Sequence, residues 1–423
     1  MHLTIEKLIY GGDGLARLPA DERGRGKAVF VPFVLENEEV EAILTEQKPG
    51  FAKARLDSVI QPSPSRIDPG CPYFQRCGGC HYQHTAFAHQ LEIKAAILKE
   101  NLRRIAKLDL TSDLQIHSAE PWYYRNRTRL KVRSGPDFAL GYYKFNSHDL
   151  LPIDRCPISS PLINHAIKAV TAAEPPLVGI HEIEFFANAD DKQLLLELYC
   201  APGTPPETAQ TAVDQARPLL PEISGVVAFT NQPEPQRLAA AGASELSYIT
   251  QHATYRVSAG AFFQTNRHLT DELISIAIAD QKGATALDLY AGGGLFSSVL
   301  SRNFERVVAV ESSLISHADL RYNSPANVKV VRGMVDQYLR TVSRKLHPDL
   351  VVVDPPRGGL GESVVHTLVT LGAPRITYVS CDPATLSRDL GGLLKSGYKV
   401  ERAHLVDLFP QTYHLETVFH LKR

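Results

Sequence analysis

Cys381 is the residue whose type and position most strongly suggest covalent chemistry. It follows an apolar stretch, residues 375–380, that is expected to form a strand, and it precedes Asp382 and Pro383. Aspartate is a favoured helix cap and proline suits the first helical turn, so a helix should begin here. A helix N-terminus favours the thiolate, although the charge of Asp382 opposes this effect. A lone cysteine is often only a buried packing residue, but the end of a strand is where a nucleophile would be presented.

Glu416 is a candidate acid–base partner for this thiol. In a covalent thiol mechanism, the sulfur can be eliminated only after a proton has been removed from the substrate. A nearby carboxylate or histidine is needed to remove that proton. Two apolar stretches near the C-terminus, residues 399–409 and 414–423, lie a few residues apart and predict a final antiparallel hairpin. A glutamate on an edge strand is usually just solvated, so the hypothesis requires that this hairpin folds back beside Cys381.

A glycine-rich loop at residues 288–296 follows one expected strand and opens a helix. Glycines there allow a tight turn and close approach of a ligand. Glu311 ends the next strand, where a carboxylate can bind both hydroxyls of a ribose. The pairing indicates a nucleoside site without distinguishing NAD from S-adenosylmethionine, and a tight turn with no ligand is the alternative.

Asp354 ends a further strand and should face the same crevice. Two prolines and then Arg357 follow it. An aromatic residue at the position of Arg357 would be typical of enzymes that methylate an adenine amino group, so the arginine disfavours that reaction.

Cysteines are clustered in one part of the chain. Three of the six, Cys71, Cys77 and Cys80, lie within ten residues of one another. In a reducing compartment such clustering favours a metal site over disulfides. Cys200 lies in an apolar stretch and is expected to be a packing residue.

The composition is that of a soluble globular protein. The chain has 423 residues, 44% of them hydrophobic, and a formal net charge of −1, which predicts two or three domains. It contains no run of about 18 apolar residues, so no membrane span is expected. Its start lacks the basic and apolar segments of a secretion signal, so a cytoplasmic location is expected. The near-zero charge argues mildly against nucleic acid unless positive charge is concentrated locally.

Three consecutive segments with different patterns of apolar residues should form the domains that position these residues. The expected fold class is multidomain α/β. Residues 1–60 predict a small β-barrel of the OB type, whose basic loop at 20–27 is either a solvated tip or a phosphate contact. Residues 61–257 contain a proline-rich linker, the cysteine cluster, an amphipathic helix at 84–107 and then a mixed α+β domain. Residues 258–423 alternate strands and helices and predict a Rossmann-like parallel sheet. The helix at 84–107 is a candidate to pack on this last domain.

A run of alternating basic residues in the second unit is a candidate RNA surface. Alternate residues of a strand project to one face, and cations beside aromatic rings suit a nucleic-acid backbone with unstacked bases. A solvated sheet face is an equally good interpretation. The basic residues are Arg125, Arg127, Arg129, Lys131 and Arg133, and the neighbouring aromatics are Trp122, Tyr123 and Tyr124.

Taken together, six blocks resemble the RNA uracil-C5 (5-methyluridine) methyltransferase family, and the resemblance covers nearly the whole chain. The blocks are GAFFQTN (260–266), DLYAGGGLFS (288–297), Glu311, DPPRGG (354–359), YVSCDPATLSRDL (378–390) and FPQTYHLETV (409–418). The resemblance implies that Cys381 adds to carbon 6 of uracil, so that carbon 5 can attack the methyl group of S-adenosylmethionine. It implies that Glu416 then removes the carbon-5 proton.

The same resemblance suggests contacts for the cofactor and the base. It implies that Gln264, Tyr290, Glu311 and Asp354 bind S-adenosylmethionine, with Asp354 also near the uracil. Phe262 or Phe263 could stack on a base, or the pair could simply pack in the core. The segment after Glu311 departs from the family pattern, so Asn323 is not assigned to the cofactor.

The resemblance further implies an RNA-binding TRAM domain at the N-terminus and a [4Fe–4S] cluster held by Cys71, Cys77, Cys80 and Cys156. Zinc is the rival metal, although the five-residue gap is unlike the paired CxxC of a zinc ribbon. The expected substrate is an unpaired or flipped uridine, in 23S ribosomal RNA or, alternatively, in the T-loop of transfer RNA. A non-enzymatic RNA-binding iron–sulfur protein is the alternative of another class. A cytosine-C5 or DNA methyltransferase is disfavoured because its cysteine usually follows a proline, and no obligate protein partner is inferred.

Overall fold

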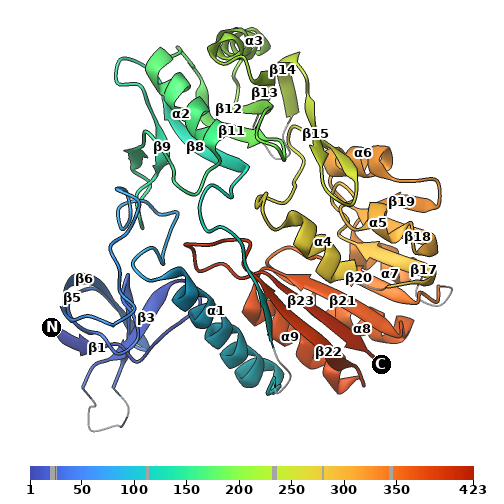
Figure 1. Ribbon diagram of the computed structural model, residues 1–423, viewed down its shortest axis with the longest axis horizontal. Coiled ribbons are helices and arrows are strands. Elements are labelled where there is room, and N and C mark those ends of the chain that lie inside the picture. Colours follow the sequence, from blue (N-terminus) through green and yellow to red (C-terminus); the bar gives the residue numbers. More distant parts are fainter. Residues whose placement is uncertain (20–23, 25, 111–113, 231–235, 279–280, 343–345) are drawn as a thin grey trace.

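The computed structural model describes residues 1–19, 24, 26–110, 114–230, 236–278, 281–342 and 346–423. These residues form a small N-terminal β-domain, a central mixed domain and a C-terminal α/β domain (Figure 1). The three parts surround the loop that joins the last two strands, drawn in red near the middle of the view. Within the described ranges, no helix has the length and apolar character needed to cross a membrane.

The N-terminal β-domain is a six-stranded sheet in the order β1-β5-β6-β4-β3-β2. It curls so that β1 also contacts β3, and it buries alternate residues such as Val29, Val31 and Val40. In the predicted basic loop, residues 20–23 and 25 lie outside the described residues. The strands are β1 (His2–Thr4), β2 (Lys7–Leu8), β3 (Asp13–Arg17), β4 (Ala28–Pro32), β5 (Glu39–Gln47) and β6 (Phe51–Gln61).

The central domain is a seven-stranded sheet in the order β10-β9-β8-β11-β12-β13-β14. Its pairs are antiparallel except β12 and β13, and two helices share an apolar core with the strands. The strands are β8 (Arg127–Arg133), β9 (Ala139–Tyr143), β10 (Leu150–Pro152), β11 (Ile180–Ala187), β12 (Leu194–Cys200), β13 (Ile223–Thr230) and β14 (Gln236–Gly242). The helical segments are α2 (Pro161–Ala173), α3 (Pro206–Ala216) and a 3-10 turn (Arg217–Leu219). Cys200 is fully buried in this core, as expected.

The C-terminal sheet has eight strands in the order β19-β18-β17-β20-β21-β23-β22-β7. The first five are parallel and β23 is antiparallel to both its neighbours, so the predicted Rossmann-like sheet with a final hairpin is confirmed. A separate hairpin, β15 (Glu245–Ile249) and β16 (Thr254–Ser258), packs on this domain. The strands are β17 (Gly283–Leu289), β18 (Phe304–Glu311), β19 (Val328–Arg332), β20 (Leu350–Val353), β21 (Arg375–Ser380), β22 (Lys399–Val406) and β23 (Thr417–Lys422).

Helices cover both faces of this sheet because its central strands are apolar on both sides. One core contains α4 and α5 with the β15–β16 hairpin, and the other contains α7, α8 and α9. The helices are α4 (Thr270–Ile278), α5 (Ser297–Leu300), α6 (Leu314–Asn323), α7 (Val335–Val342), α8 (Gly361–Leu371) and α9 (Pro383–Lys395).

The helix predicted at residues 84–107 is observed as α1 (Phe87–Asn101), extended by one π-helical turn (Leu102–Ala106). It packs through Leu98 and Leu102 on the core that contains α9, and it lies between the N-terminal β-domain and the C-terminal sheet (Figure 1). The chain after it forms β7 (Gln115–His117), which adds a parallel edge strand beside β22. The sequence did not predict this strand, because three residues carry too little periodicity.

Candidate active site

The loop after β17 is shaped so that its backbone can approach a ligand. Tyr290 and Gly294 have φ angles of 65° and 93°, in the left-handed region that favours glycine. A Cβ atom at Gly294 would lie 3.0 Å from a methyl carbon of Leu320 in α6. Oε2 of Glu311, at the end of β18, accepts a 2.9 Å hydrogen bond from the N–H of Gly292. The predicted ribose-binding carboxylate therefore lies against the predicted nucleoside loop.

Asn323 supports this loop from the end of α6. Its side-chain amide donates to the carbonyl oxygens of Gly293 and Arg256, at 2.8 and 3.0 Å. Its oxygen accepts from the N–H of Arg256 at 2.8 Å. Because both amide hydrogens already have partners, Asn323 holds the loop in place and is not available to donate to a cofactor.

Two carboxyl groups, the buried Asp288 and the half-buried Asp354, stand at the carboxyl ends of β17 and β20. Asp288 accepts a hydrogen bond from the hydroxyl of Ser297, and burial raises its pKa to about 6. Burial, and then the charge of Asp288, raise the pKa of Asp354 to about 7. Carboxyl groups perturbed in this way, at the ligand-facing edge of a doubly wound sheet, are typical of functional sites.

Cys381 lies between β21 and α9, as predicted. The carboxylate of Asp382 caps α9 by accepting hydrogen bonds from the N–H groups of Ala384 and Thr385, at 3.0 and 2.8 Å. Burial first, and then the charge of Glu416, raise the pKa of Cys381 to about 12. The helix N-terminus was expected to lower the pKa of this thiol. Desolvation and the surrounding carboxylates outweigh that effect.

Glu416 immediately precedes β23, and the hairpin brings it to Cys381. Its carboxyl group is buried, and one of its oxygens, Oε1, has no hydrogen-bond partner. Burial, and then the charge of Asp354, raise the pKa of Glu416 well above its usual range. The charge of Asp354 also raises the pKa of Cys381. The structure thus brings together three of the predicted residues: Asp354 and Cys381 directly follow β20 and β21, and Glu416 directly precedes the antiparallel β23.

The loop between β22 and β23 is held by side chains that the sequence analysis did not single out. Nζ of Lys94, fully buried on α1, donates to Asp407 at 2.6 Å and to the carbonyl oxygen of Phe409 at 2.9 Å. One turn earlier on α1, Gln90 exchanges two 3.0 Å hydrogen bonds with Gln411. Polar residues four positions apart on the buried face of a helix were the available signal, because buried polar groups need partners.

Gln264 lies in the segment between β16 and α4 and is buried. Arg127 of β8 donates to the carbonyl oxygen of Ala261 at the start of this segment. The two phenylalanines have different surroundings: Phe263 is 4% exposed and packs in the core, whereas Phe262 is 65% exposed. Of the pair, only Phe262 is exposed enough for its ring to contact a ligand.

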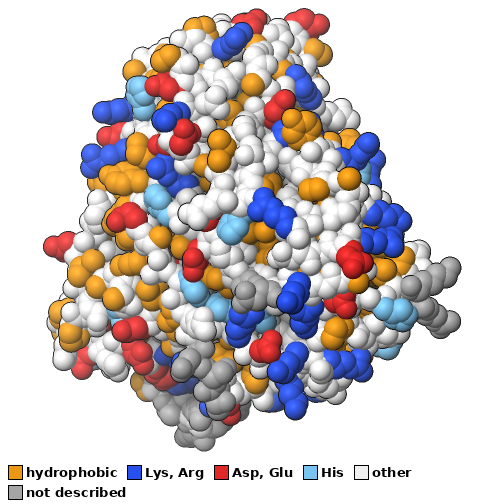
Figure 2. Space-filling model, turned by 45° about the vertical axis from the view of Figure 1, so that its right-hand side comes forward, with side chains coloured by type: hydrophobic (Ala, Val, Ile, Leu, Met, Phe, Trp, Pro, Cys, Tyr) orange, Lys and Arg blue, Asp and Glu red, His pale blue; other side chains and the backbone are white. Residues whose placement is uncertain are grey.

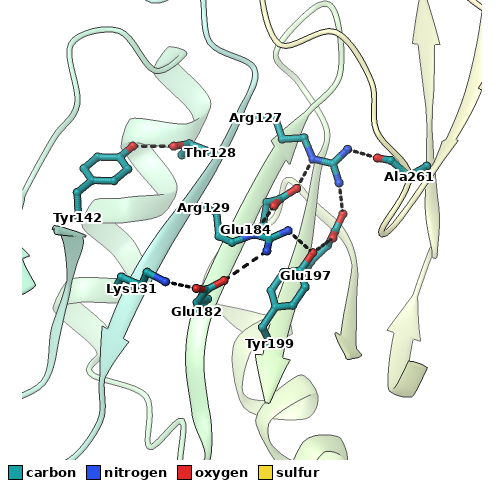
Figure 3. Close-up of polar contacts among 10 residues, drawn as sticks. All are labelled: Arg127, Thr128, Arg129, Lys131, Tyr142, Glu182, Glu184, Glu197, Tyr199 and Ala261. Carbon is teal, nitrogen blue, oxygen red and sulfur yellow. Dashed lines mark hydrogen bonds and ion pairs between the residues drawn. The ribbon is translucent and has the colours of Figure 1, made fainter. Parts of the chain in front are cut away.

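The alternating cations of β8 share one face, as predicted, but carboxylates neutralise them there (Figure 3). The cross-strand register places Glu184 opposite Arg129 and Glu182 opposite Lys131, and both pairs form ion pairs. Arg127 also binds Glu184 and is buried. These three cations therefore do not form a free basic stripe for RNA, whereas Arg133 at the end of β8 is exposed and donates to the carbonyl oxygen of Asp137. On the face shown in Figure 2, Lys and Arg side chains are likewise interspersed with carboxylates.

The four cysteines implied as cluster ligands line one small cavity: Cys71, Cys77, Cys80 and Cys156, with Arg125 in the same wall. Burial raises the pKa of Cys77 to about 11 and that of Cys80 further, and the charge of Cys156 adds to both shifts. In the described part of the chain, no group of three or more His, Cys, Asp or Glu side chains is arranged to hold a metal ion. Nε of Arg125 is buried in this wall without a hydrogen-bond partner.

Comparisons with known proteins match both ends of the chain. A family described as tRNA (uracil-5-)-methyltransferase matches residues 241–423, and the TRAM domain matches residues 1–56. An uncharacterised RNA methyltransferase of Clostridium acetobutylicum is 31% identical over 425 residues, covering 93% of this chain and 92% of the relative. Another, from Aquifex aeolicus, is 30% identical over 427 residues, covering 99% and 97%.

A solved structure shares the fold of the whole chain. The tRNA (uracil-54, C5)-methyltransferase of Pyrococcus abyssi, in complex with S-adenosyl-L-homocysteine, matches with a TM-score of 0.74 and 21% identity, and both chains are fully covered. The N-terminal β-domain, the nucleoside loop and the sheet that carries Cys381 are therefore parts of one known architecture. The chain belongs to the tRNA (uracil-5-)-methyltransferase family of S-adenosylmethionine-dependent RNA methyltransferases and carries an N-terminal TRAM domain.

Proposed function

We propose that this enzyme methylates carbon 5 of a uridine in 23S ribosomal RNA, with Cys381 as the covalent nucleophile and Glu416 as the base. The observation that carries the proposal is the convergence of Cys381, Glu416 and Asp354 at the ligand-facing edge of the sheet. A thiol and two carboxyl groups beside a nucleoside loop are what addition to a pyrimidine ring and subsequent elimination require. Gln264, Tyr290, Glu311 and Asp354 are proposed to hold S-adenosylmethionine, which supplies an electrophilic methyl group.

The thiol of Cys381, which is partly exposed, must first lose its proton to solvent, and Arg357 is the nearby cation that lowers its pKa. The sulfur then bonds to carbon 6 of uracil. The electron pair of the carbon 5–carbon 6 double bond moves to carbon 5, where it is shared with the neighbouring carbonyl group as an enolate. Carbon 5 uses this pair to bond the methyl carbon of the co-substrate, while the bond from that carbon to the sulfonium sulfur breaks and leaves its electron pair on the sulfur of the departing thioether. Glu416 next removes the carbon-5 proton, the double bond re-forms, and Cys381 leaves as a thiolate. A carboxyl group with a raised pKa is a stronger base once ionised, which suits this last step.

The RNA target is tested by mass mapping of RNA from cells with and without the gene. Ribosomal RNA is preferred because a TRAM domain combined with four clustered cysteines resembles the branch of the family that acts on it. Transfer RNA is the second candidate, because the solved relative with the same fold is named for that substrate. Loss of one 5-methyluridine from 23S RNA supports the first, loss from the T-loop supports the second, and no loss from any RNA contradicts both.

A groove of about 880 Å³ between the TRAM domain and the end of α1 is the surface that we propose for the RNA backbone. Four cations and two carboxylates line it, and Lys7, Arg17 and Arg104 form ion pairs with Glu100 or Glu6, which leaves Arg103. Arg103 has no ion-pair partner in the described part of the chain and is exposed. A free cation of this kind binds a phosphate by releasing a counterion. An RNA substrate and a cluster of thiols are the reasons for which we propose a cytoplasmic location.

We further propose that Cys71, Cys77, Cys80 and Cys156 hold a [4Fe–4S] cluster. Their donor set suits it, because four thiolates satisfy such a cluster, and they share one cavity. The half-buried Arg125, whose buried Nε lacks a partner, would offset the negative charge of the thiolates.

The metal content is expected to be about four iron atoms per chain after anaerobic purification, with a brown colour. Changing Cys80 to serine should remove the colour and the iron, whereas changing the buried Cys200 to alanine should leave both. Metal analysis by plasma mass spectrometry measures the result. A colourless protein that contains zinc would overturn the cluster assignment in favour of the rival metal.

A further inference from the structure

A turn of the TRAM domain reaches the loop that carries Cys381. The hydroxyl of Tyr10 donates a 3.1 Å hydrogen bond to the backbone carbonyl oxygen of Cys381. The ring of Tyr10 packs edge-on against Tyr413, with centroids 5.3 Å apart and planes at 89°. Tyr413 belongs to the same loop as Glu416. One side chain from the first domain therefore contacts both segments that carry the proposed catalytic residues.

The position of Tyr10 is fixed by the structure around it. The turn is closed by hydrogen bonds from the N–H of Ile9 to the carbonyl oxygen of Asp13, at 2.9 Å, and from Gly12 to Ile9, at 3.2 Å. Gly12 has a φ of +94°, and a Cβ atom there would lie 2.9 Å from a ring carbon of His81. A residue with a side chain would thus be strained and would collide with His81.

His81 continues the contact toward the catalytic loop. Its ring packs edge-on against Tyr413 at 4.6 Å, and its backbone N–H donates to the carbonyl oxygen of Gln411 at 2.8 Å. The TRAM turn, His81 and the loop between β22 and β23 form one packed unit. A shift of the turn would therefore be transmitted to both catalytic segments.

We propose that Tyr10 is a positioning residue for Cys381, so that the TRAM domain completes the active site in addition to binding RNA. This inference rests on the proposed role of Cys381 as nucleophile. The hydrogen bond fixes the peptide between β21 and α9, and hence the direction of the Cys381 side chain. It also places a donor on a carbonyl oxygen whose partial negative charge would otherwise act on the thiolate of the same residue.

The charges around Cys381 explain why such a donor matters. Glu416, Asp354 and Asp382 each raise the pKa of Cys381, after the larger effect of burial, and Arg357 opposes them. Tyr10 itself stays a neutral donor, because burial and the charge of Asp382 raise its pKa. In a site dominated by negative charge, one correctly oriented donor gives a measurable gain in thiolate.

The test compares Tyr10→Phe, which removes only the hydroxyl, with wild-type protein and with Tyr143→Phe. Tyr143 is 37% exposed and lies on β9, and its hydroxyl has no hydrogen bond in the described chain, so it is the matched control. The first measurement is the alkylation rate of Cys381 by iodoacetamide at several pH values, read by peptide mass spectrometry. We expect Tyr10→Phe to react about threefold to tenfold more slowly near neutral pH, the effect of one hydrogen bond, and its pH profile to shift upward.

The second measurement is single-turnover methylation of RNA. Tyr10→Phe should lower the maximal rate at saturating RNA by a similar factor, whatever its effect on RNA affinity, because Tyr10 also lines the groove proposed for RNA. Tyr143→Phe should change neither the rate nor the affinity. An unchanged alkylation profile, or a loss confined to RNA affinity, would overturn the positioning role. If the wild-type protein forms no covalent RNA adduct, the proposed mechanism fails, but the alkylation comparison still decides whether Tyr10 acts on the Cys381 thiol.

Discussion

Replacement of Cys381 by alanine is expected to lower methylation by about 10⁴-fold or more, the scale seen when a covalent nucleophile is removed. The reason is that carbon 5 of uracil is a poor nucleophile until a thiolate has bonded to carbon 6. Binding of S-adenosylmethionine should persist, because the nucleoside loop and Glu311 are held by their own hydrogen bonds. Transfer of a labelled methyl group to RNA and calorimetric titration of the cofactor measure the two effects.

Cys200→Ala is the matched control for this change. Cys200 is also a thiol, but it is fully buried in the core of the central domain. Its loss should leave the rate per folded molecule unchanged. Methylation by Cys381→Ala at a rate close to that of the wild type would remove the covalent mechanism altogether.

Replacement of Glu416 by glutamine is expected to trap the methylated RNA on the protein. Addition and methyl transfer do not need this carboxylate, whereas removal of the carbon-5 proton does, so turnover should fall by about 10²–10⁴-fold. The trapped species should appear on a denaturing gel as a protein–RNA adduct that carries the labelled methyl group. Glutamine has nearly the same size as glutamate, so the buried site should keep its packing.

Two further variants give this experiment its controls. The double variant Cys381→Ala/Glu416→Gln should form no adduct, because the bond to RNA runs through the thiol. Glu401→Gln changes an exposed glutamate on β22 that pairs with Lys422, and it should behave as wild type. Normal turnover by Glu416→Gln, or an adduct that survives the loss of Cys381, would show that the base or the nucleophile lies elsewhere.

The architecture of the site explains how a reactive thiol can be kept stable before substrate binds. Burial and three carboxyl groups hold Cys381 in its protonated form, which protects it from adventitious oxidation. The buried Lys94–Asp407 ion pair fixes the loop that ends in Glu416. Breaking one partner of such a pair leaves an unpaired buried charge, so the geometry of the base depends on α1, far from it in sequence.

The sequence by itself determined the C-terminal sheet, the nucleoside loop and the cap of α9. These features depend on neighbouring residues: strand and helix periodicity, glycines in a turn, and Asp382 followed by Pro383. Local order along the chain is enough to specify them. The final hairpin could also be predicted, but the proximity of Glu416 to Cys381 requires that β23 insert between β21 and β22, which local order does not specify.

Only the tertiary structure decided which charges remain free. Periodicity placed Arg127, Arg129 and Lys131 on one face correctly, but it could not reveal that Glu182 and Glu184 lie opposite them, since those partners come from a distant strand. The contact of Tyr10 with Cys381 joins residues 371 positions apart, and no local pattern records such a pair. Partners brought together by packing of separate domains depend on the whole fold, because their interaction energy exists only after each domain has formed.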